Sequence, residues 1–152
     1  MKAYEDFTVD SDNATTFNGT KEYVADLRAN QNKKVVPIID AGLQMSDDSP
    51  YISMANTENC LIKDYSSGNP ITTKVWPEFA GVDGTATQNY VFLDWFHPSA
   101  KSVWSLGLTN LYAQMEFDGI WLDMNEVTSF CNGQTTDMCM VQRPNSSYSR
   151  VN

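Results

Sequence analysis

Apolar and polar positions alternate along the first part of this chain in blocks that predict a helix and then a strand. A helix is expected over residues 19–30, where Tyr23, Val24 and Leu27 share one face and charged residues separate them. Residues 34–40 then form a near-continuous apolar run. Such a run is typical of a strand that is buried on both faces of a sheet.

The second half of the chain repeats this order. Pro98 stands where a first helical residue is expected, and the helix should run to about Glu116. A short buried strand, Ile120 to Leu122, then carries Asp123 at its carboxyl end. The apolar face of the predicted helix is formed by Val103, Trp104, Leu106, Leu108, Leu111 and Tyr112. Two strands joined by a helix predict a right-handed βαβ unit and an α/β fold.

Residues 41–90 interrupt this alternation. They are rich in Gly, Ser, Asn and Asp and lack clear periodicity. The stretch is interpreted as a long inserted loop with short strands near 60–62 and 72–76, and a short extended segment over 91–94 follows it. Loops of this length are usually functional. From Thr128 to Asn152 the chain again has the composition of a loop.

Composition excludes some classes of function. The net charge of −9 argues against a nucleic-acid partner, whose phosphates require a basic face. No apolar run approaches the roughly 18 residues of a membrane span. Lys2 and Glu5 interrupt any apolar signal sequence at the start. With 41% hydrophobic residues, the chain can form a packed core.

Three cysteines and three glycosylation sequons bear on the cellular compartment in which the protein is found. Cys131 and Cys139 flank a short polar loop, which suits a disulfide, and Cys60 is then left as a buried thiol. Asn-x-Ser/Thr sequons begin at Asn13, Asn18 and Asn145. Together these features favour the secretory pathway, with a lysosomal, extracellular or luminal location. The alternative is that Asn-rich loops produce sequons by accident.

Asp123 carries the strongest functional signal. A carboxylate at the end of a core strand, with Trp121 and Met124 on either side, is a plausible catalytic group, because the strand ends of α/β barrels hold such groups. The run 117–126 resembles the nucleophile segment of glycoside hydrolase family 31, the retaining α-glucosidases, which carry a Trp-x-Asp-Met-Asn-Glu motif. Further similarities lie at 6–10, 36–40, 74–77 and 127–130, so the resemblance spans about Lys2 to Gly133 and favours the lysosomal and intestinal branch.

The resemblance implies a (β/α)8 TIM barrel, of which residues 1–152 would form a part. A complete barrel needs about 250 residues. The chain would therefore supply about two strand–helix units plus the inserted loop 41–90. In this family the acid/base lies well downstream of the nucleophile, which here means beyond Asn152. The isolated chain is expected to be inactive, with the remaining barrel or another chain as its partner.

The resemblance also implies roles for individual residues. Asp123 is expected to be the nucleophile, although an Asp can simply cap a strand end. Trp76 and Trp121 would line the sugar subsite, and core packing is the alternative for both. Met124 matches a residue of the pocket wall.

Three further positions complete the predicted site. Asp40 would either bind a sugar hydroxyl or brace the pocket. Ile38 matches an apolar pocket position and is equally suited to core packing. Glu126 is expected to brace the loop through an ion pair or hydrogen bond.

Other chemistry finds little support in the sequence. The single histidine, His97, is interpreted as a residue at a helix start, and the cysteines lack metal-ligand spacing. No metal and no cofactor is predicted. The expected function is hydrolysis of terminal α-linked glucose from oligo- or polysaccharides through a covalent glycosyl-enzyme intermediate. The alternative is a non-catalytic carbohydrate-binding or interaction protein that retains part of the scaffold.

Overall fold

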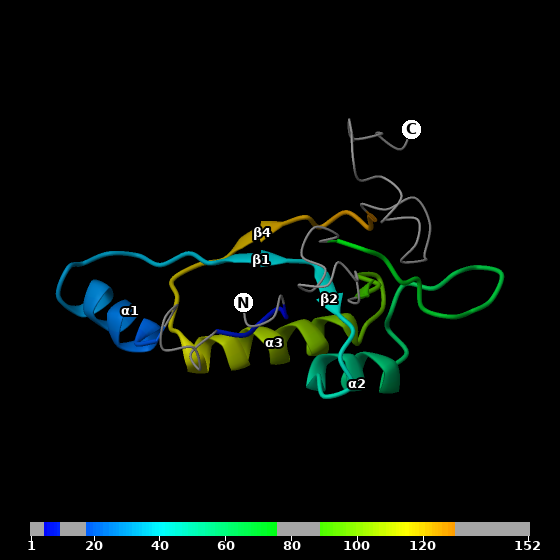
Figure 1. The fold of residues 1–152 in the computed structure, drawn as a ribbon, viewed down its shortest axis with the longest axis horizontal. Coiled ribbons are helices and arrows are strands. Elements are labelled where there is room, and N and C mark those ends of the chain that lie inside the picture. The colour runs from blue at the N-terminus through cyan, green and yellow to red at the C-terminus, as the bar shows by residue number, and fades with distance from the viewer. Residues whose placement is uncertain (1–4, 10–17, 76–88, 130–152) are drawn as a thin grey trace, which may run out of the picture.

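A computed structural model describes residues 5–9, 18–75 and 89–129 of the chain. These residues form three helices and four short strands (Figure 1). In chain order the elements are α1 (Thr20–Ala29), β1 (Ile38–Asp40), β2 (Gly42–Gln44), α2 (Pro50–Thr57), β3 (Tyr90–Phe92), α3 (Ala100–Gln114) and β4 (Trp121–Asp123).

The predicted βαβ arrangement is present. Strands β1 and β4 pair in parallel, although 80 residues separate them in the sequence, and α3 runs alongside them (Figure 1). Two backbone hydrogen bonds extend the pairing toward the amino ends of the strands. Asp118 N–H donates to the Val35 carbonyl at 2.8 Å, and Trp121 N–H donates to the Pro37 carbonyl at 2.9 Å. Pro37 therefore lies just before β1 and contributes its carbonyl, so its missing N–H costs the sheet nothing.

The long segment after β1 is more ordered than the sequence predicted. β2 and β3 pair in antiparallel register, and α2 lies between them in the sequence. The helix was missed because its eight residues are too few to show a clear period, but Pro50 at its first turn was a usable signal. The strands expected near 60–62 and 72–76 are isolated bridges instead, Leu61 to Leu93 and Thr73 to Tyr90.

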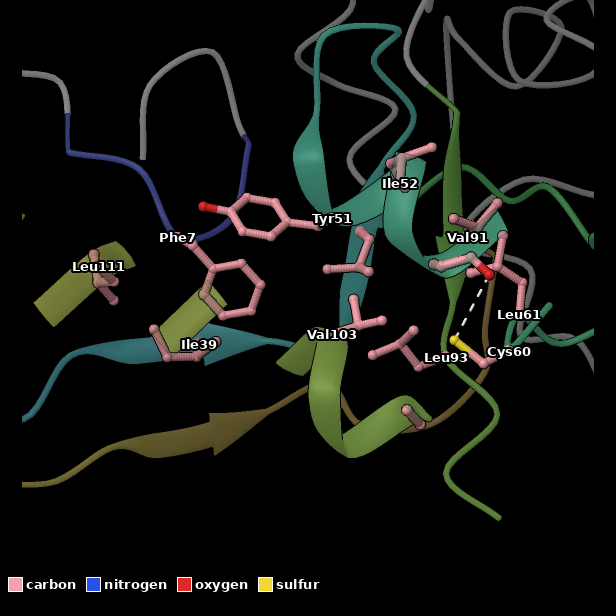
Figure 2. Close-up of a cluster of buried hydrophobic side chains, with 13 residues drawn as sticks. Phe7, Ile39, Tyr51, Ile52, Cys60, Leu61, Val91, Leu93, Val103 and Leu111 are labelled. Atoms are coloured by element: carbon pink, nitrogen blue, oxygen red, sulfur yellow. Dashed lines mark hydrogen bonds between the residues drawn. The ribbon is translucent and has the colours of Figure 1, made fainter. Parts of the chain in front are cut away.

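The main core lies between α3, α2, β1 and the amino-terminal segment (Figure 2). Phe7 is 1% exposed and makes edge-on ring contacts with Tyr51 and Trp104, each at a centroid distance of 5.0 Å. Val103 and Leu111 supply the buried part of the predicted apolar face of α3, and Trp104, Leu106 and Leu108 pack partly against the core. Tyr112, also assigned to that face, is 43% exposed.

Two predicted burial patterns are wrong in this chain. Val36 and Ile38 of the first apolar run are 54% and 47% exposed, and Trp121 and Leu122 of the last strand are 55% and 52% exposed. The physical reason is that β1 and β4 form a sheet of two strands in the described part of the chain. Helix α3 covers Ile39 of β1, whereas Leu122, its neighbour on the same face, and Ile38 and Trp121 on the opposite face are about half exposed.

Smaller differences concern the helices. α3 begins at Ala100, two residues after Pro98, because a turn over 94–99 precedes it, in which His97 N–H donates to the Asp94 carbonyl at 2.9 Å. In α1, Val24 is buried as expected, whereas Tyr23 is 63% exposed. Cys60 is a free, fully buried thiol, as predicted, and burial raises its pKa. Within the described ranges no helix is both long and apolar enough to cross a membrane.

Candidate active site at the carboxyl ends of β1 and β4

The register of β1 and β4 brings four of the predicted site residues together. Ile38 lies opposite Trp121, and Asp40 lies opposite Asp123. Successive side chains of a strand point to opposite faces, so these four residues share one face of the sheet. Ile39, between Ile38 and Asp40, points the other way and belongs to the core under α3. The two acids therefore end neighbouring strands on the face away from that core, about 4.8 Å apart in the backbone.

The backbone after Asp123 holds this acid in place. Met124 has a left-handed backbone with φ of 50°, which is uncommon for a residue other than glycine. Its N–H donates to Oδ1 of Asp123 at 2.9 Å, which leaves Oδ2 free of that bond. Met124 itself packs against a second buried cluster formed by Ala41, Val75, Tyr90 and Phe92. A strained backbone that the surrounding packing fixes is a feature of functional sites.

Asp40 is almost completely buried, with 6% of its surface exposed. Burial, and next the negative charge of Asp123, raise the pKa of the Asp40 carboxyl. Asp6 lies in the amino-terminal segment and is 4% exposed. Burial, and next the charge of Asp40, raise the pKa of Asp6 well above its usual range. The charge of Asp40 thus acts on Asp6, and the charge of Asp123 acts on Asp40. Sequence reasoning identified Asp40 and Asp123 and gave no role to Asp6.

A hydrogen bond connects the long segment between β2 and β3 to the loop that follows β4. Lys74 N–H donates to Oγ of Ser129 at 3.2 Å, so the residues before Trp76 lie against the loop that follows β4. The Lys74 side chain is buried, which lowers its pKa. Sequence reasoning did not identify this contact, since nothing in the spacing of residues 74 and 129 indicates it.

The other predicted site residues divide into two groups. Glu126 is exposed on the loop after β4, and Asn18 is exposed just before α1, where a glycan would be accessible. Outside the described residues lie Trp76, Cys131, Cys139, Asn13 and Asn145. In the part of the chain that the structure describes, no group of three or more His, Cys, Asp and Glu residues is arranged to hold a metal ion.

The arrangement has the chemistry of a carboxylate site in an α/β protein. Two acids end adjacent parallel strands, an exposed tryptophan and an isoleucine precede them on the same face, and Oδ1 of Asp123 accepts a backbone hydrogen bond. An ionised carboxylate held in this way can attack an electrophilic carbon. Strand ends are where α/β barrels place such groups.

The chain belongs to glycosyl hydrolases family 31, whose TIM-barrel domain model matches residues 1–151. Among curated proteins, it is 29% identical to the intestinal sucrase-isomaltase of Homo sapiens over 150 residues, which cover 95% of this chain and 7% of that protein. It is 33% identical to an alpha-glucosidase of Schizosaccharomyces pombe over 145 residues, covering 88% of this chain and 14% of the relative. For glucoamylase 1 of Candida albicans the identity is 30% over 140 residues, with 88% and 13% covered. The chain therefore spans between 7% and 14% of the length of these relatives.

Proposed function

We propose that this chain is the nucleophile-bearing segment of a retaining α-glucosidase, and that Asp123 attacks the anomeric carbon of a terminal α-linked glucose. The glycosidic bond breaks in this step, and the leaving oxygen takes a proton from the acid/base partner. The glycosyl ester formed on Asp123 is then hydrolysed by water, with overall retention of configuration. The acid/base partner, which retaining enzymes hold about 5 to 5.5 Å from the nucleophile, is supplied by the remainder of the barrel. The isolated chain is accordingly inactive.

The observation that carries this proposal is the register of β1 and β4. It gives the nucleophile a fixed position, a hydrogen bond from Met124 on one oxygen, and an acidic neighbour in Asp40. Trp121 and Ile38 lie on the same face and offer apolar surfaces for a sugar ring. Trp76 and Met124 are assigned to the same pocket through the family motifs, and Glu126 to the support of its loop.

The names of the relatives support an α-glucoside substrate. The relatives that share this segment are named sucrase-isomaltase, glucoamylase 1 and alpha-glucosidase. A secretory-pathway location is part of the same proposal. It is supported by the exposed sequon at Asn18 and by an intestinal relative. A Cys131–Cys139 disulfide and glycosylation at Asn13 and Asn145, which form in the secretory pathway, are also part of this proposal.

A non-catalytic carbohydrate-binding protein is the second candidate, since the same aromatic surface would hold a sugar without turnover. The left-handed turn at Met124, which fixes an oxygen of Asp123, favours the enzyme because a binding surface does not require a restrained carboxylate. The complete sequence distinguishes these two candidate functions. A downstream acid/base residue would support the enzyme, and its absence would support the binding protein.

The direct test is Asp123→Asn in the full-length protein. The amide keeps the shape of the side chain but cannot form the glycosyl ester. We expect turnover of an α-glucoside to fall by about 10⁴-fold or more while sugar binding persists. Asn125→Asp is a matched control, because Asn125 is exposed and follows the site by two residues. Near-normal turnover of Asp123→Asn would contradict the proposal.

A further inference from the structure

The loop that follows β4 carries a hydroxyl that the proposed mechanism does not use. Ser129 follows Asp123 by six residues, and its Oγ accepts a hydrogen bond from the backbone N–H of Lys74 at 3.2 Å. The two partners lie 55 residues apart in the sequence. The contact therefore connects the loop after the nucleophile to the segment that leads to Trp76.

The segment 73–75, which provides the N–H of this contact, is buried and fixed on the β2–β3 sheet. Thr73, Lys74 and Val75 are 5%, 4% and 2% exposed. Thr73 and Tyr90 of β3 exchange two backbone hydrogen bonds, at 2.8 and 2.9 Å. β3 in turn pairs with β2 (Figure 1). The segment 73–75 is thus held by hydrogen bonds and by packing, and it offers a firm anchor to the loop.

The other end of the loop packs on the same anchor. Met124 packs against the buried cluster formed by Ala41, Val75, Tyr90 and Phe92. A Cβ atom on Gly42 of β2 would lie 3.2 Å from Cγ2 of Val75, so the Val75 side chain lies directly on the β2 backbone. Residues 125–127, between the two ends of the loop, are exposed. The loop is therefore attached to residues 74 and 75 at both ends, by packing at Met124 and by a hydrogen bond at Ser129.

This attachment reaches the nucleophile through Met124. The backbone of Met124 is left-handed, with φ of 50°, and its N–H donates to Oδ1 of Asp123 at 2.9 Å. A residue other than glycine keeps such a backbone only where the surrounding structure fixes it. Packing fixes the Met124 end of the loop, and the hydrogen bond of Ser129 fixes the other end. Loss of that hydrogen bond would release the exposed part of the loop and weaken the turn that orients the Asp123 carboxylate.

We propose that Ser129 is a positioning residue for the nucleophile: its hydroxyl attaches the loop after β4 to the segment 73–75 and so keeps Met124 in the turn that orients Asp123. Ser129 acts through Met124 and takes no part in bond making or breaking. A displacement of about 1 Å at a reacting group is enough to reduce a rate by about 100-fold, so a single attachment point can affect turnover. This inference rests on the proposed function, in which Asp123 attacks the sugar.

The test measures kcat and KM for an α-glucoside in three variants of the full-length protein, Ser129→Ala, Ser129→Cys and Ser129→Thr. Ala offers no acceptor to the Lys74 N–H, so kcat should fall by about 10- to 100-fold, with KM within about threefold of wild type. Cys keeps the size of Ser but is a weak acceptor, and its kcat should lie between those of Ala and wild type. Thr keeps the hydroxyl and should retain kcat within about threefold. Thr128→Ala, which removes a hydroxyl from the preceding residue, is the matched control and should leave both constants unchanged.

The rate at which a mechanism-based glucoside forms the ester on Asp123 distinguishes positioning from stability. This rate should fall by about 10-fold or more in Ser129→Ala, while a competitive sugar analogue binds as it does to the wild type. A variant that melts at a lower temperature but keeps the wild-type kcat and trapping rate would show a purely structural role and overturn the inference. A rise in KM at unchanged kcat would overturn it as well, and so would a Thr variant as slow as Ala.

Two further outcomes keep this test decisive. If Ser129→Ala does not fold, the comparison of Cys with Thr still applies, and equal kcat values for these two variants would contradict the inference. Failure of the proposed function has a different signature, because the wild-type protein itself would then give no α-glucoside turnover and no ester on Asp123. That result would overturn this inference together with the proposed function.

Discussion

At the scale of single residues, Phe7 organises the segment that leads to the site. Its ring is 1% exposed, and two aromatic side chains contact it edge-on. The ring also lies against Gly107 of α3, where an added Cβ atom would lie 2.4 Å from Cε2 of Phe7. Glycine at this position lets the ring lie directly on the helix backbone. The position of Asp6, one residue earlier, depends on that contact.

Gly107→Ala is therefore predicted to destabilise the protein. Alanine in a helix would by itself be favourable by about 1 kcal/mol. The clash with a ring that is enclosed on several sides should cost more, about 1 to 3 kcal/mol. Thermal unfolding of the full-length protein should give a lower melting temperature for Gly107→Ala than for the wild type. Gly119→Ala is the control, because its Cβ would meet Cγ2 of Val36 at an ordinary 3.7 Å. A rise in the melting temperature of Gly107→Ala would contradict this packing.

At the scale of elements, Asp118 joins the amino ends of β1 and β4. Its Oδ2 accepts from Val35 N–H at 3.1 Å, and its carboxylate lies 3.3 Å from Nε of Arg28 and from Nζ of Lys34. Arg28 also pairs with Glu116, which ties α1 to the end of α3. The backbone hydrogen bond from Val35 lowers the pKa of Asp118, burial opposes it, and Lys34 and Arg28 lower it further. These contacts lie at the amino ends of β1 and β4, whereas Asp40 and Asp123 lie at the carboxyl ends of the same strands.

Asp118→Asn is predicted to destabilise the protein near neutral pH and to have no such effect in acid. The pKa of Asp118 is lower in the folded than in the unfolded state, so its stabilisation is present above the unfolded value of about 3.9 and is lost as the pH falls through the folded value. Chemical denaturation measures the free energy of unfolding of wild type and variant. At pH 7 the variant should be less stable than the wild type, and below pH 3 the two should be equally stable. Asp47→Asn, on an exposed residue, is the control. An equal effect at both pH values would contradict the electrostatic account.

Part of the fold was predictable from the sequence, and the failures have physical causes. The two apolar runs and the helix between them predicted the order of β1, α3 and β4, although the strands are less buried in this chain than those runs indicated. Helix α2 was missed since eight residues hold barely two turns. The parallel register, which places Asp40 opposite Asp123, depends on packing over 80 residues of sequence, and no local pattern encodes it. Asp123 and Asp40 were identified through a motif, whereas Asp6 became visible through its burial.

At the scale of the whole molecule, half-exposed apolar side chains gather on and beside β1 and β4 in the described part of the chain. Val36, Ile38, Trp121 and Leu122 are each about half exposed. Leu122 points opposite to the site, on the side where a barrel strand would contact its helix layer. A two-stranded sheet is too small to be stable by itself. These surfaces are where we expect the remaining strands and helices of the barrel to pack.

Residues 1–152 expressed alone are therefore predicted to expose apolar surface and to have no turnover. Dye binding and light scattering should detect the open surface, and an α-glucoside assay should give no signal. Co-expression with the remaining barrel as a separate polypeptide should reduce dye binding and restore activity. A compact monomer that hydrolyses the glucoside by itself would contradict the account of an incomplete barrel.

The central claim is that Asp123 forms the covalent bond to the sugar. A mechanism-based glucoside that traps the glycosyl-enzyme should be incubated with the full-length protein, and the labelled peptide should be sequenced by mass spectrometry. The account predicts a single ester on Asp123, which Asp123→Asn abolishes. A label on Asp40 or Glu126, with Asp123 unmodified, would contradict it.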